Sequence, residues 1–204
     1  MEPFVRLQSV AAALPDQNID TDIIYPGRFL TVTSASGLGR YALHDWRFDD
    51  QGREVESFVL NKSQWKMAQI LVVGSNFGCG SSREHAVWSL ADIGIRCVVS
   101  TSFGEIFQGN CYKNGVLPLV VDQETYAVLV NDALEARMLD IDLQTLTIKR
   151  QRGEVLSFEL SEARRLALVN GWDEIDMIRN QEHANIVDFE ARQRQMQPWQ
   201  YRND

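Results

Sequence analysis

The chain has 204 residues, of which 45% are hydrophobic and 24% are charged, and its net charge is −8 at neutral pH. This length suits one domain with a buried core, and the composition is that of an ordinary globular protein. A negative charge without a cluster of lysines and arginines argues against nucleic-acid binding. No run approaches the roughly 18 apolar residues of a membrane span, and the N-terminus lacks a signal peptide pattern, so we expect a cytoplasmic protein without membrane contact.

The three cysteines are Cys79, Cys97 and Cys111, and no C-x-x-C pair occurs among them. An odd number at wide spacing predicts neither a disulfide framework nor a zinc or iron–sulfur site built from this chain alone. Any metal that the protein uses is therefore expected from another chain.

The first part of the chain combines one strand with polar loops. Residues 4–14 predict a strand. Residues 20–22, Asp-Thr-Asp, are on their own more typical of a turn, where Asp bonds its own backbone, than of a functional site. The small, glycine-bearing residues 33–39 favour an ordinary surface loop over a mobile loop above a site.

From residue 70 the pattern alternates between short strands and helices. Strands are predicted at residues 70–73, 96–100 and 116–121. Pro118 within the last of them indicates an edge strand or a bulge. Such alternation predicts parallel strands joined by right-handed crossovers.

The two helices between these strands carry start and stop signals. Residues 81–84 and 102–105 both read Ser-x-x-Glu, the capping-box pattern of a helix N-terminus. Gly94 and Gly115 are expected to end the helices. The central part of the chain is therefore predicted as a βαβαβ segment.

The remainder predicts a helix followed by a second sheet. Apolar residues repeat at helical spacing over 126–134, and the period then changes to two, which predicts antiparallel strands with one buried face. These strands are expected at residues 139–143, 146–148 and 156–160, and a helix at 162–170 is expected to end at Gly171. We take residues 1–192 as a single domain and residues 193–204, rich in Gln and Arg, as a C-terminal tail.

Most candidate chemistry lies in residues 74–85, Gly-Ser-Asn-Phe-Gly-Cys-Gly-Ser-Ser-Arg-Glu-His, which follow the strand predicted at 70–73. The glycines allow close approach of the backbone to another group. Gly78-x-Gly80 lacks the third glycine of a dinucleotide fingerprint, no Gly-Lys-Ser/Thr follows as in a P-loop, and the nucleophile elbow G-x-S-x-G does not fit.

Ser81 and Arg83 are the informative residues of this stretch. For an isolated Ser-x-x-Glu, capping alone is the favoured interpretation. It leaves Arg83 unexplained, because a helix N-terminus prefers an acidic residue, and an arginine there suits a bound carboxylate. A Ser81 hydroxyl beside unpaired helix N–H groups would also be stabilised as a base. Cys79 is better read as a small buried thiol than as a nucleophile, and His85 as structural.

Residues 76–86 resemble the motif of the swivelling domain of the aconitase superfamily, and within it the small subunits of hydro-lyases that isomerise isopropylmalate. Supporting segments lie at residues 18–22, 28–30, 45–47, 102–103, 106–107 and 110–118. The resemblance extends from about residue 4 to about residue 192. It implies an α/β fold, a three-layer β/β/α swivelling domain with a central βαβ unit.

The resemblance also implies residue roles. Ser81 would be the base that removes a proton beside a carboxylate, and Ser82 and Arg83 would hold a substrate carboxylate. Arg28, Phe29 and Leu30 would contact the group that distinguishes the substrate. A [4Fe–4S] cluster would be held by a separate large subunit, not by this chain, and would act as a Lewis acid on the departing hydroxyl. The chain would be active only in that heterodimer, on a small dicarboxylate.

The implied reaction dehydrates 2-isopropylmalate and rehydrates the alkene to 3-isopropylmalate, in leucine biosynthesis. One departure concerns the loop after residues 20–22, where the family pattern Asp-Gln-Ile-Ile-Pro is replaced by Asp-Ile-Ile-Tyr-Pro, which places Tyr25 in the loop. A methyl- or dimethyl-substituted malate therefore stays open as the substrate. Two other classes also stay open on the sequence alone: a non-catalytic organic-anion-binding module, and a stand-alone Ser or Cys hydrolase.

Overall fold

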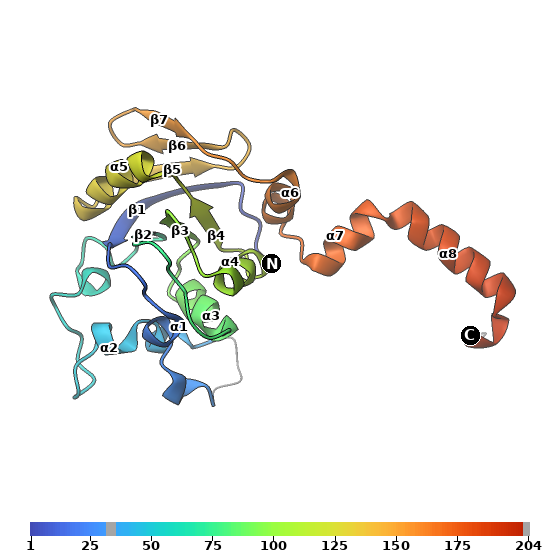
Figure 1. The fold of residues 1–204 in the computed structure, drawn as a ribbon, viewed down its shortest axis with the longest axis horizontal. Helices are drawn as coiled ribbons and strands as arrows, with labels where there is room; N and C mark the ends of the chain where they lie inside the picture. The colour runs from blue at the N-terminus through green and yellow to red at the C-terminus, as the bar shows by residue number, and fades with distance from the viewer. Residues whose placement is uncertain (32–35, 202–204) are drawn as a thin grey trace. The chain divides into compact units, whose positions relative to one another are not determined.

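The computed structural model of the protein describes residues 1–31 and 36–201 (Figure 1). The chain divides into two compact units, Met1–Gly171 and Trp172–Asp204. Part of the surface loop expected at 33–39, and the last three residues of the expected tail, lie outside the described residues.

The first unit is built on one seven-stranded mixed sheet with the order β4-β3-β2-β1-β5-β6-β7 (Figure 1). The strands are β1 (Arg6–Leu14), β2 (Ile70–Val73), β3 (Cys97–Ser100), β4 (Leu117–Val120), β5 (Met138–Asp142), β6 (Thr147–Arg150) and β7 (Val155–Ser157). Strands β1 to β4 pair in parallel, and β5 to β7 pair antiparallel. The predicted parallel segment and the edge position of the strand that contains Pro118 are confirmed.

Strand β1 belongs to both parts of the sheet. Its first half, Arg6–Val10, pairs antiparallel with β5, and its second half, Ala11–Leu14, pairs in parallel with β2. The expectation of a separate second sheet is therefore wrong, because the antiparallel strands continue the parallel ones through β1. The apolar pattern of a strand records which face is buried and not which strand lies beside it, so the sequence could not show this continuity.

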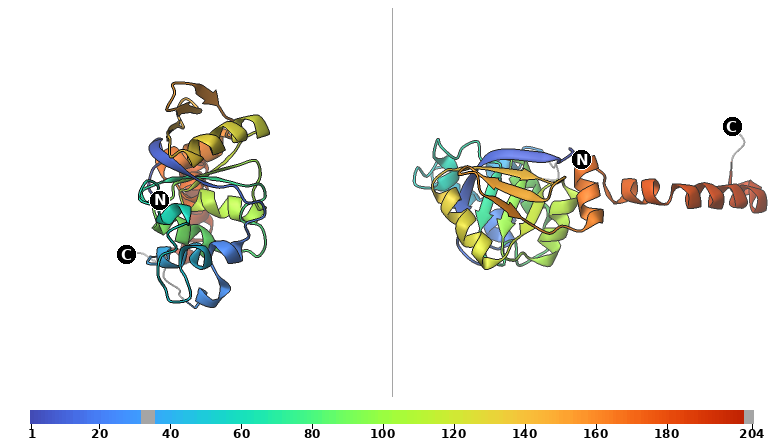
Figure 2. Two further views of the ribbon diagram at one scale, coloured as in Figure 1. Left: turned by 90° about the vertical axis from the view of Figure 1, so that its left-hand side faces the viewer. Right: turned by 90° about the horizontal axis from the view of Figure 1, so that it is seen from above.

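The helices of the first unit lie between the strands of the sheet in the chain order, except the last one, which follows β7. They are α1 (Thr21–Ile24), α2 (His44–Arg47), α3 (Glu84–Asp92), α4 (Glu105–Lys113), α5 (Gln123–Leu134) and α6 (Glu162–Asn170), with 3-10 turns η1 (Gly27–Phe29), η2 (Gly39–Tyr41) and η3 (Val59–Asn61). Helices α3 and α4 are the two predicted crossovers, and α5 packs against β1 and β2 (Figure 2). Gly171 ends α6 in the left-handed conformation, as predicted.

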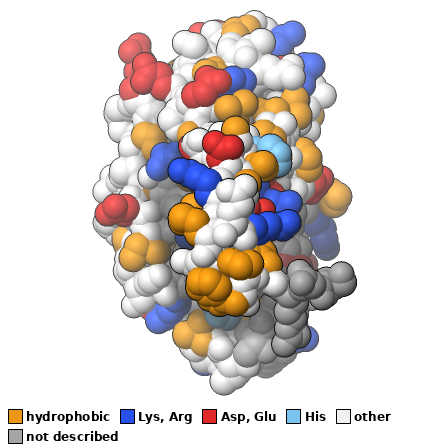
Figure 3. Space-filling view, turned by 90° about the vertical axis from the view of Figure 1, so that its right-hand side faces the viewer, with side chains coloured by type: hydrophobic (Ala, Val, Ile, Leu, Met, Phe, Trp, Pro, Cys, Tyr) orange, Lys and Arg blue, Asp and Glu red, His pale blue; other side chains and the backbone are white. Residues whose placement is uncertain are grey.

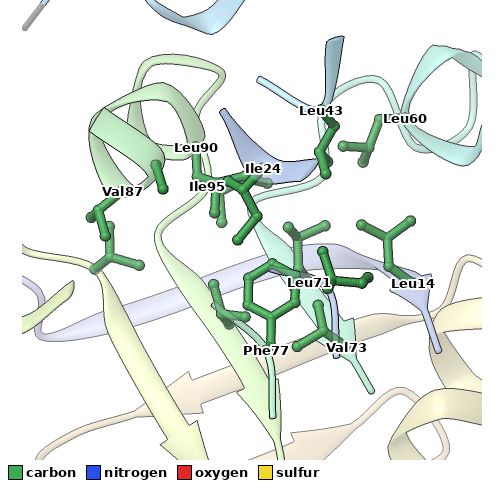
Figure 4. Packing of buried hydrophobic residues seen from close by; sticks show 14 of the residues in the cluster. Leu14, Ile24, Leu43, Leu60, Leu71, Val73, Phe77, Val87, Leu90 and Ile95 are labelled. Carbon is green, nitrogen blue, oxygen red and sulfur yellow. The ribbon is translucent and has the colours of Figure 1, made fainter. Parts of the chain in front are cut away.

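The core lies on both faces of the parallel strands. Leu71 and Val73 of β2 point to a cluster that includes Val87 and Leu90 of α3 (Figure 4). Their neighbours Ile70 and Val72 point to a second cluster, which holds residues of α5 and of the antiparallel strands: Leu129, Ala133, Leu139, Ile141 and Ile148. Coverage of both faces explains why these strands read as uninterrupted apolar runs.

The carboxyl ends of β1, β2 and β3 meet at one edge of the sheet, because the three strands are parallel neighbours. From these ends begin the segments 15–22, 74–83 and 101–104. Ligands of α/β proteins bind preferentially outside the carboxyl ends of parallel strands. This edge is therefore where a site is expected.

The second unit contains α7 (Glu174–Gln181), α8 (His183–Met196) and the 3-10 turn η4 (Pro198–Gln200). Asp173 caps α7 in a capping box with Asp176. No described residue of α7 or α8 is buried, and hydrophobic side chains stay on the surface beside charged ones (Figure 3). No helix in the described part of the chain is long and apolar enough to cross a membrane.

Candidate active site

The segment 74–83, here called the glycine turn, lies against the Asp-Thr-Asp segment. The backbone N–H of Gly78 donates to the carbonyl oxygen of Ile19 at 2.7 Å, and the N–H of Thr21 donates to that of Cys79 at 2.9 Å. These bonds pair the two segments in parallel beyond the ends of β1 and β2. Segments about 60 residues apart in sequence thus form one surface.

The close approach that glycine permits in this turn is to the chain itself. Gly78 has φ +72°, and a Cβ there would lie 2.2 Å from the ring of Phe107. A Cβ on Gly104 would lie 2.4 Å from the carbonyl oxygen of Gly78. Phe107 is buried in the core, so the turn is anchored by packing from beneath.

Two serines at the end of β3 also hold the glycine turn. The hydroxyl of Ser100 donates to the carbonyl oxygen of Gly74 at 2.8 Å, and the hydroxyl oxygen of Ser102 accepts from the N–H of Asn76 at 2.9 Å. The capping box expected at 102–105 is therefore wrong, since Ser102 serves the neighbouring turn. Helix α4 begins with Gly104 as its N-cap, without a side-chain cap bond.

The capping box expected at 81–84 is also wrong. Helix α3 begins at Glu84, its N-cap is Arg83, and no side-chain bond caps it. The carboxylate of Glu84 instead accepts a hydrogen bond from Nδ2 of Asn114 at 2.8 Å, and Oδ1 of Asn114 accepts from Nε1 of Trp88 at 2.9 Å. Glu84 thus ties α3 to α4.

Ser81 lies in the exposed part of the glycine turn, just before α3. Its carbonyl oxygen accepts a hydrogen bond from Oγ1 of Thr21 at 2.9 Å, and Thr21 itself is buried. The backbone of Ser81 is therefore fixed from the Asp-Thr-Asp segment, while the residue stays exposed. The role of Thr21 was not predicted, because its partner is distant in sequence.

Arg83 lies between the Asp-Thr-Asp segment and the next turn. Its Nη1 forms an ion pair with Asp22, and a Cβ on Gly27 would lie 3.6 Å from the same Nη1. The Arg83 side chain is 18% exposed and the Asp22 side chain 54%, so the guanidinium is the more sheltered partner. Arg83 thus links the Asp-Thr-Asp segment with the turn that begins at Gly27.

The predicted contact residues Arg28, Phe29 and Leu30 lie in and after η1 but face different surroundings. Arg28 is tied to Asp45 by both of its terminal nitrogens. Phe29 is half-buried and stacks on Tyr41, with ring centroids 4.2 Å apart. Leu30 is exposed and is the more exposed of the two apolar side chains among the three.

Tyr25 lies fully buried beneath this loop. Its hydroxyl donates to the carbonyl oxygen of Phe29 at 2.9 Å, and its ring contacts those of Tyr41 and His85. Tyr25, the residue that departs from the family pattern, therefore supports the loop from the buried side. His85 packs between Tyr25 and Trp88, which agrees with a structural role.

The described residues do not fit an iron–sulfur cluster. Cys97 and Cys111 are buried in the core, and burial raises the pKa of both thiols, which disfavours the thiolate form that iron requires. Among the described residues, no group of three His, Cys, Asp or Glu side chains could hold a metal ion.

The chain resembles known proteins over most of its length. The model of the aconitase C-terminal domain matches residues 1–124. A 3-isopropylmalate dehydratase small subunit from Paracoccus denitrificans is 47% identical over 203 residues, which cover 98% of this chain and 100% of the relative. One from Brucella melitensis biotype 1 is 48% identical over 202 residues, with the same coverage.

The chain belongs to the aconitase C-terminal domain family and, within it, to the 3-isopropylmalate dehydratase small subunits. The expected hydro-lyase subunit is thereby confirmed, and the name small subunit implies a large one. A solved structure titled 3-isopropylmalate dehydratase, from Methanocaldococcus jannaschii, has a TM-score of 0.66 at 23% identity and covers 90% of this chain and 99% of its own. That likeness supports the fold, a single α/β domain with a curled, mixed sheet.

Proposed function

We propose that Ser81 is the base of the dehydratase, the residue that removes a proton from the carbon beside a substrate carboxylate. The observation that carries this proposal is the fixing of Ser81 by Thr21 at the carboxyl edge of the parallel strands, in an exposed position. A base must reach its proton while its backbone stays in place, and this arrangement meets both needs.

The basicity of a serine alkoxide must be lowered before it can act near neutral pH. Ser81 does not cap α3, so direct bonds from the helix N–H groups do not provide this. We propose that the positive end of the α3 dipole and the guanidinium of Arg83 would stabilise a negative oxygen. Both come from the residues that directly follow Ser81 in the chain.

Ser82 and Arg83 would hold a carboxylate of the substrate. In the structure Arg83 already binds a carboxylate, that of Asp22. A guanidinium has five N–H donors in a planar fork, so it can bind a second carboxylate or exchange one for another. The exposed side of the Asp22–Arg83 pair is where the substrate would enter.

The remaining contacts would select the substrate. Arg28, Phe29 and Leu30 form the proposed specificity loop, and Leu30 suits an isopropyl group because it is apolar and exposed. Since Tyr25 is buried beneath the loop, its presence does not require a smaller substrate. The proposed reaction is therefore the conversion of 2-isopropylmalate to 3-isopropylmalate in leucine biosynthesis.

The partner would be a large subunit that carries the [4Fe–4S] cluster, in a cytoplasmic heterodimer. When bound, the cluster would supply a Lewis acid for the hydroxyl that leaves, while this chain moves the proton and orients the carboxylates. We further propose that residues 1–192 form the swivelling domain, with residues 193–204 as a tail.

The test is reconstitution of the full chain with its large subunit and cluster. Ser81→Ala should abolish turnover of 3-isopropylmalate. The dissociation constant of the complex between the enzyme and 3-isopropylmalate should change little. Ser161→Ala is a matched control, because this exposed serine precedes α6 without capping it. Full activity of Ser81→Ala in the assembled enzyme would refute the proposed base.

A further inference from the structure

Asp45 of α2 is a carboxylate that the proposed function does not use, although it grips a residue that the function does use. Nη1 of Arg28 donates to Oδ2 of Asp45 at 3.0 Å, and Nη2 donates to Oδ1 of the same carboxylate. This is the two-pronged geometry in which a guanidinium and a carboxylate fix each other's orientation. Asp45 therefore sets the direction of the Arg28 side chain.

The contact extends from α2 into the proposed specificity loop. The guanidinium carbon of Arg28 lies 4.5 Å from the centre of the Phe29 ring, and Phe29 in turn stacks on Tyr41. Nδ1 of His44 lies 3.2 Å from Nη2 of Arg28 and 3.1 Å from Oδ1 of Asp45. The loop is thus held against α2 by the ion pair between Arg28 and Asp45 and by the contact of Arg28 with His44.

The cleft beside this pair has a volume of about 420 Å³. Asp49 and Asp50 line it together with Arg28, His44 and Asp45. Asp49 is already bound to Arg53, through Nε at 2.9 Å. Asp45 is therefore the one carboxylate of the cleft that contacts Arg28 among the described residues.

Both partners are half-exposed, at 51% for Arg28 and 58% for Asp45. Ion pairs with this exposure contribute little to the free energy of unfolding, because water screens them and two long side chains must be ordered. If the pair had only a structural role, removing it would therefore change the free energy of unfolding very little. A role in orienting Arg28 would change substrate binding instead.

We propose that Asp45 is a positioning residue for substrate binding: it holds Arg28, and through it the loop 27–30, in the orientation that receives the substrate. This inference rests on the proposed contact between Arg28 and the substrate. It adds α2 to the site, although α2 carries none of the residues assigned to the reaction itself.

The test is a double-mutant cycle in the reconstituted enzyme. Asp45→Asn keeps the shape of the side chain but removes its charge, and it should raise KM for 3-isopropylmalate about fivefold with kcat nearly unchanged. In an Arg28→Ala background the same substitution should add nothing, because its effect passes through Arg28. Asp45→Glu should recover part of the lost affinity, and Asp49→Asn, in the same cleft, should leave KM unchanged.

Two results would overturn the inference: an unchanged KM in Asp45→Asn while Arg28→Ala raises it, or additive effects in the double variant. If Arg28→Ala alone leaves KM unchanged, the proposed substrate contact fails. Hydrogen exchange of the backbone amides of residues 27–31 in the full chain then tests whether Asp45 positions the loop. Asp45→Asn should speed this exchange, and only when Arg28 is present. Exchange that is equal in wild type and Asp45→Asn would overturn the positioning role independently of activity.

Discussion

The hydroxyl of Thr21 donates a hydrogen bond to the carbonyl oxygen of Ser81 at 2.9 Å, across sixty positions of the sequence. Thr21 is buried and Ser81 is exposed. A buried residue therefore fixes the backbone of an exposed one. The proposed base is held from behind, by a side chain that itself lies in the core.

Replacing Thr21 by Val should reduce activity more than stability. Valine fills the same buried volume, and the Ser81 carbonyl can bond to water instead, so the free energy of unfolding should fall by only about 1 kcal/mol. Loss of the fixed position of Ser81 should lower kcat by roughly 10- to 100-fold. Kinetics of the reconstituted enzyme would show this, and Thr145→Val is the control, since the Thr145 side chain is exposed and bonds to Thr147, away from the glycine turn. Equal kcat values for Thr21→Val and wild type would contradict the argument.

Gly78→Ala should destabilise the protein far more than Gly52→Ala. Both glycines have similar positive φ, +72° and +75°, so both variants carry the left-handed strain of about 1–2 kcal/mol. A Cβ on Gly52 meets nothing within 4 Å, whereas one on Gly78 overlaps Phe107. Overpacking of a core adds about 1–3 kcal/mol. Urea unfolding of both variants separates the two contributions, and similar midpoints would show that Phe107 moves aside freely.

The substrate preference should depend on Leu30 of the proposed specificity loop and not on Tyr25. Leu30→Ala removes exposed apolar contact and should lower the preference for isopropylmalate over malate with a smaller substituent, by roughly 10-fold. Tyr25→Phe removes a buried hydroxyl bonded to Phe29, so it should lower stability by about 1 kcal/mol and leave the ratio of kcat/KM values unchanged. A panel of substituted malates measures the ratio. A changed ratio in Tyr25→Phe would place Tyr25 in the substrate's surroundings after all.

Asp132 should make stability depend on pH at the acidic end. Burial alone would raise the pKa of Asp132, but hydrogen bonds from Arg150 and Arg137 outweigh it and hold the pKa below its ordinary value. A carboxylate with a lowered folded pKa stabilises the protein above its unfolded pKa of about 3.9, and this contribution is lost as pH falls through the folded pKa.

Asp132→Asn should therefore cost about 3–5 kcal/mol at pH 7, since it leaves two sheltered arginines without their shared partner. The difference from wild type should shrink as pH falls through the folded pKa of Asp132. Glu154→Gln removes only an exposed partner of Arg150 and should cost less than about 1 kcal/mol. Urea unfolding from pH 7 to pH 3 tests both variants, and a constant difference would contradict the assignment.

The regular elements of the first unit could be predicted because their signals are local. The apolar run at 70–73 is β2 itself, and Gly171 ends α6 where a left-handed residue was expected. Helix α3 was also predictable, although Arg83, expected inside its first turn, is its N-cap. These features depend on residues within a few positions of one another.

The contacts that the sequence did not predict all join segments that are distant in the chain. Ser102 bonds to Asn76 and Glu84 to Asn114, so neither completes the capping box that its spacing indicates. Asp45 of α2 forms an ion pair with Arg28. A short polar side chain serves a neighbouring turn as readily as its own helix end, and only the fold decides which partner is closer.

Strand β1 is synthesised before the other strands of the sheet. Among the four parallel strands, it is the one whose pairing is completed last. Ala11–Leu14 can join β2 once residue 73 has emerged, but Arg6–Val10 must wait for β5 at Met138–Asp142. Neither half of the sheet is finished without the same strand. Unfolding of the first unit should therefore show one transition, and a nascent chain should keep this strand half unpaired until most of the subunit has been made.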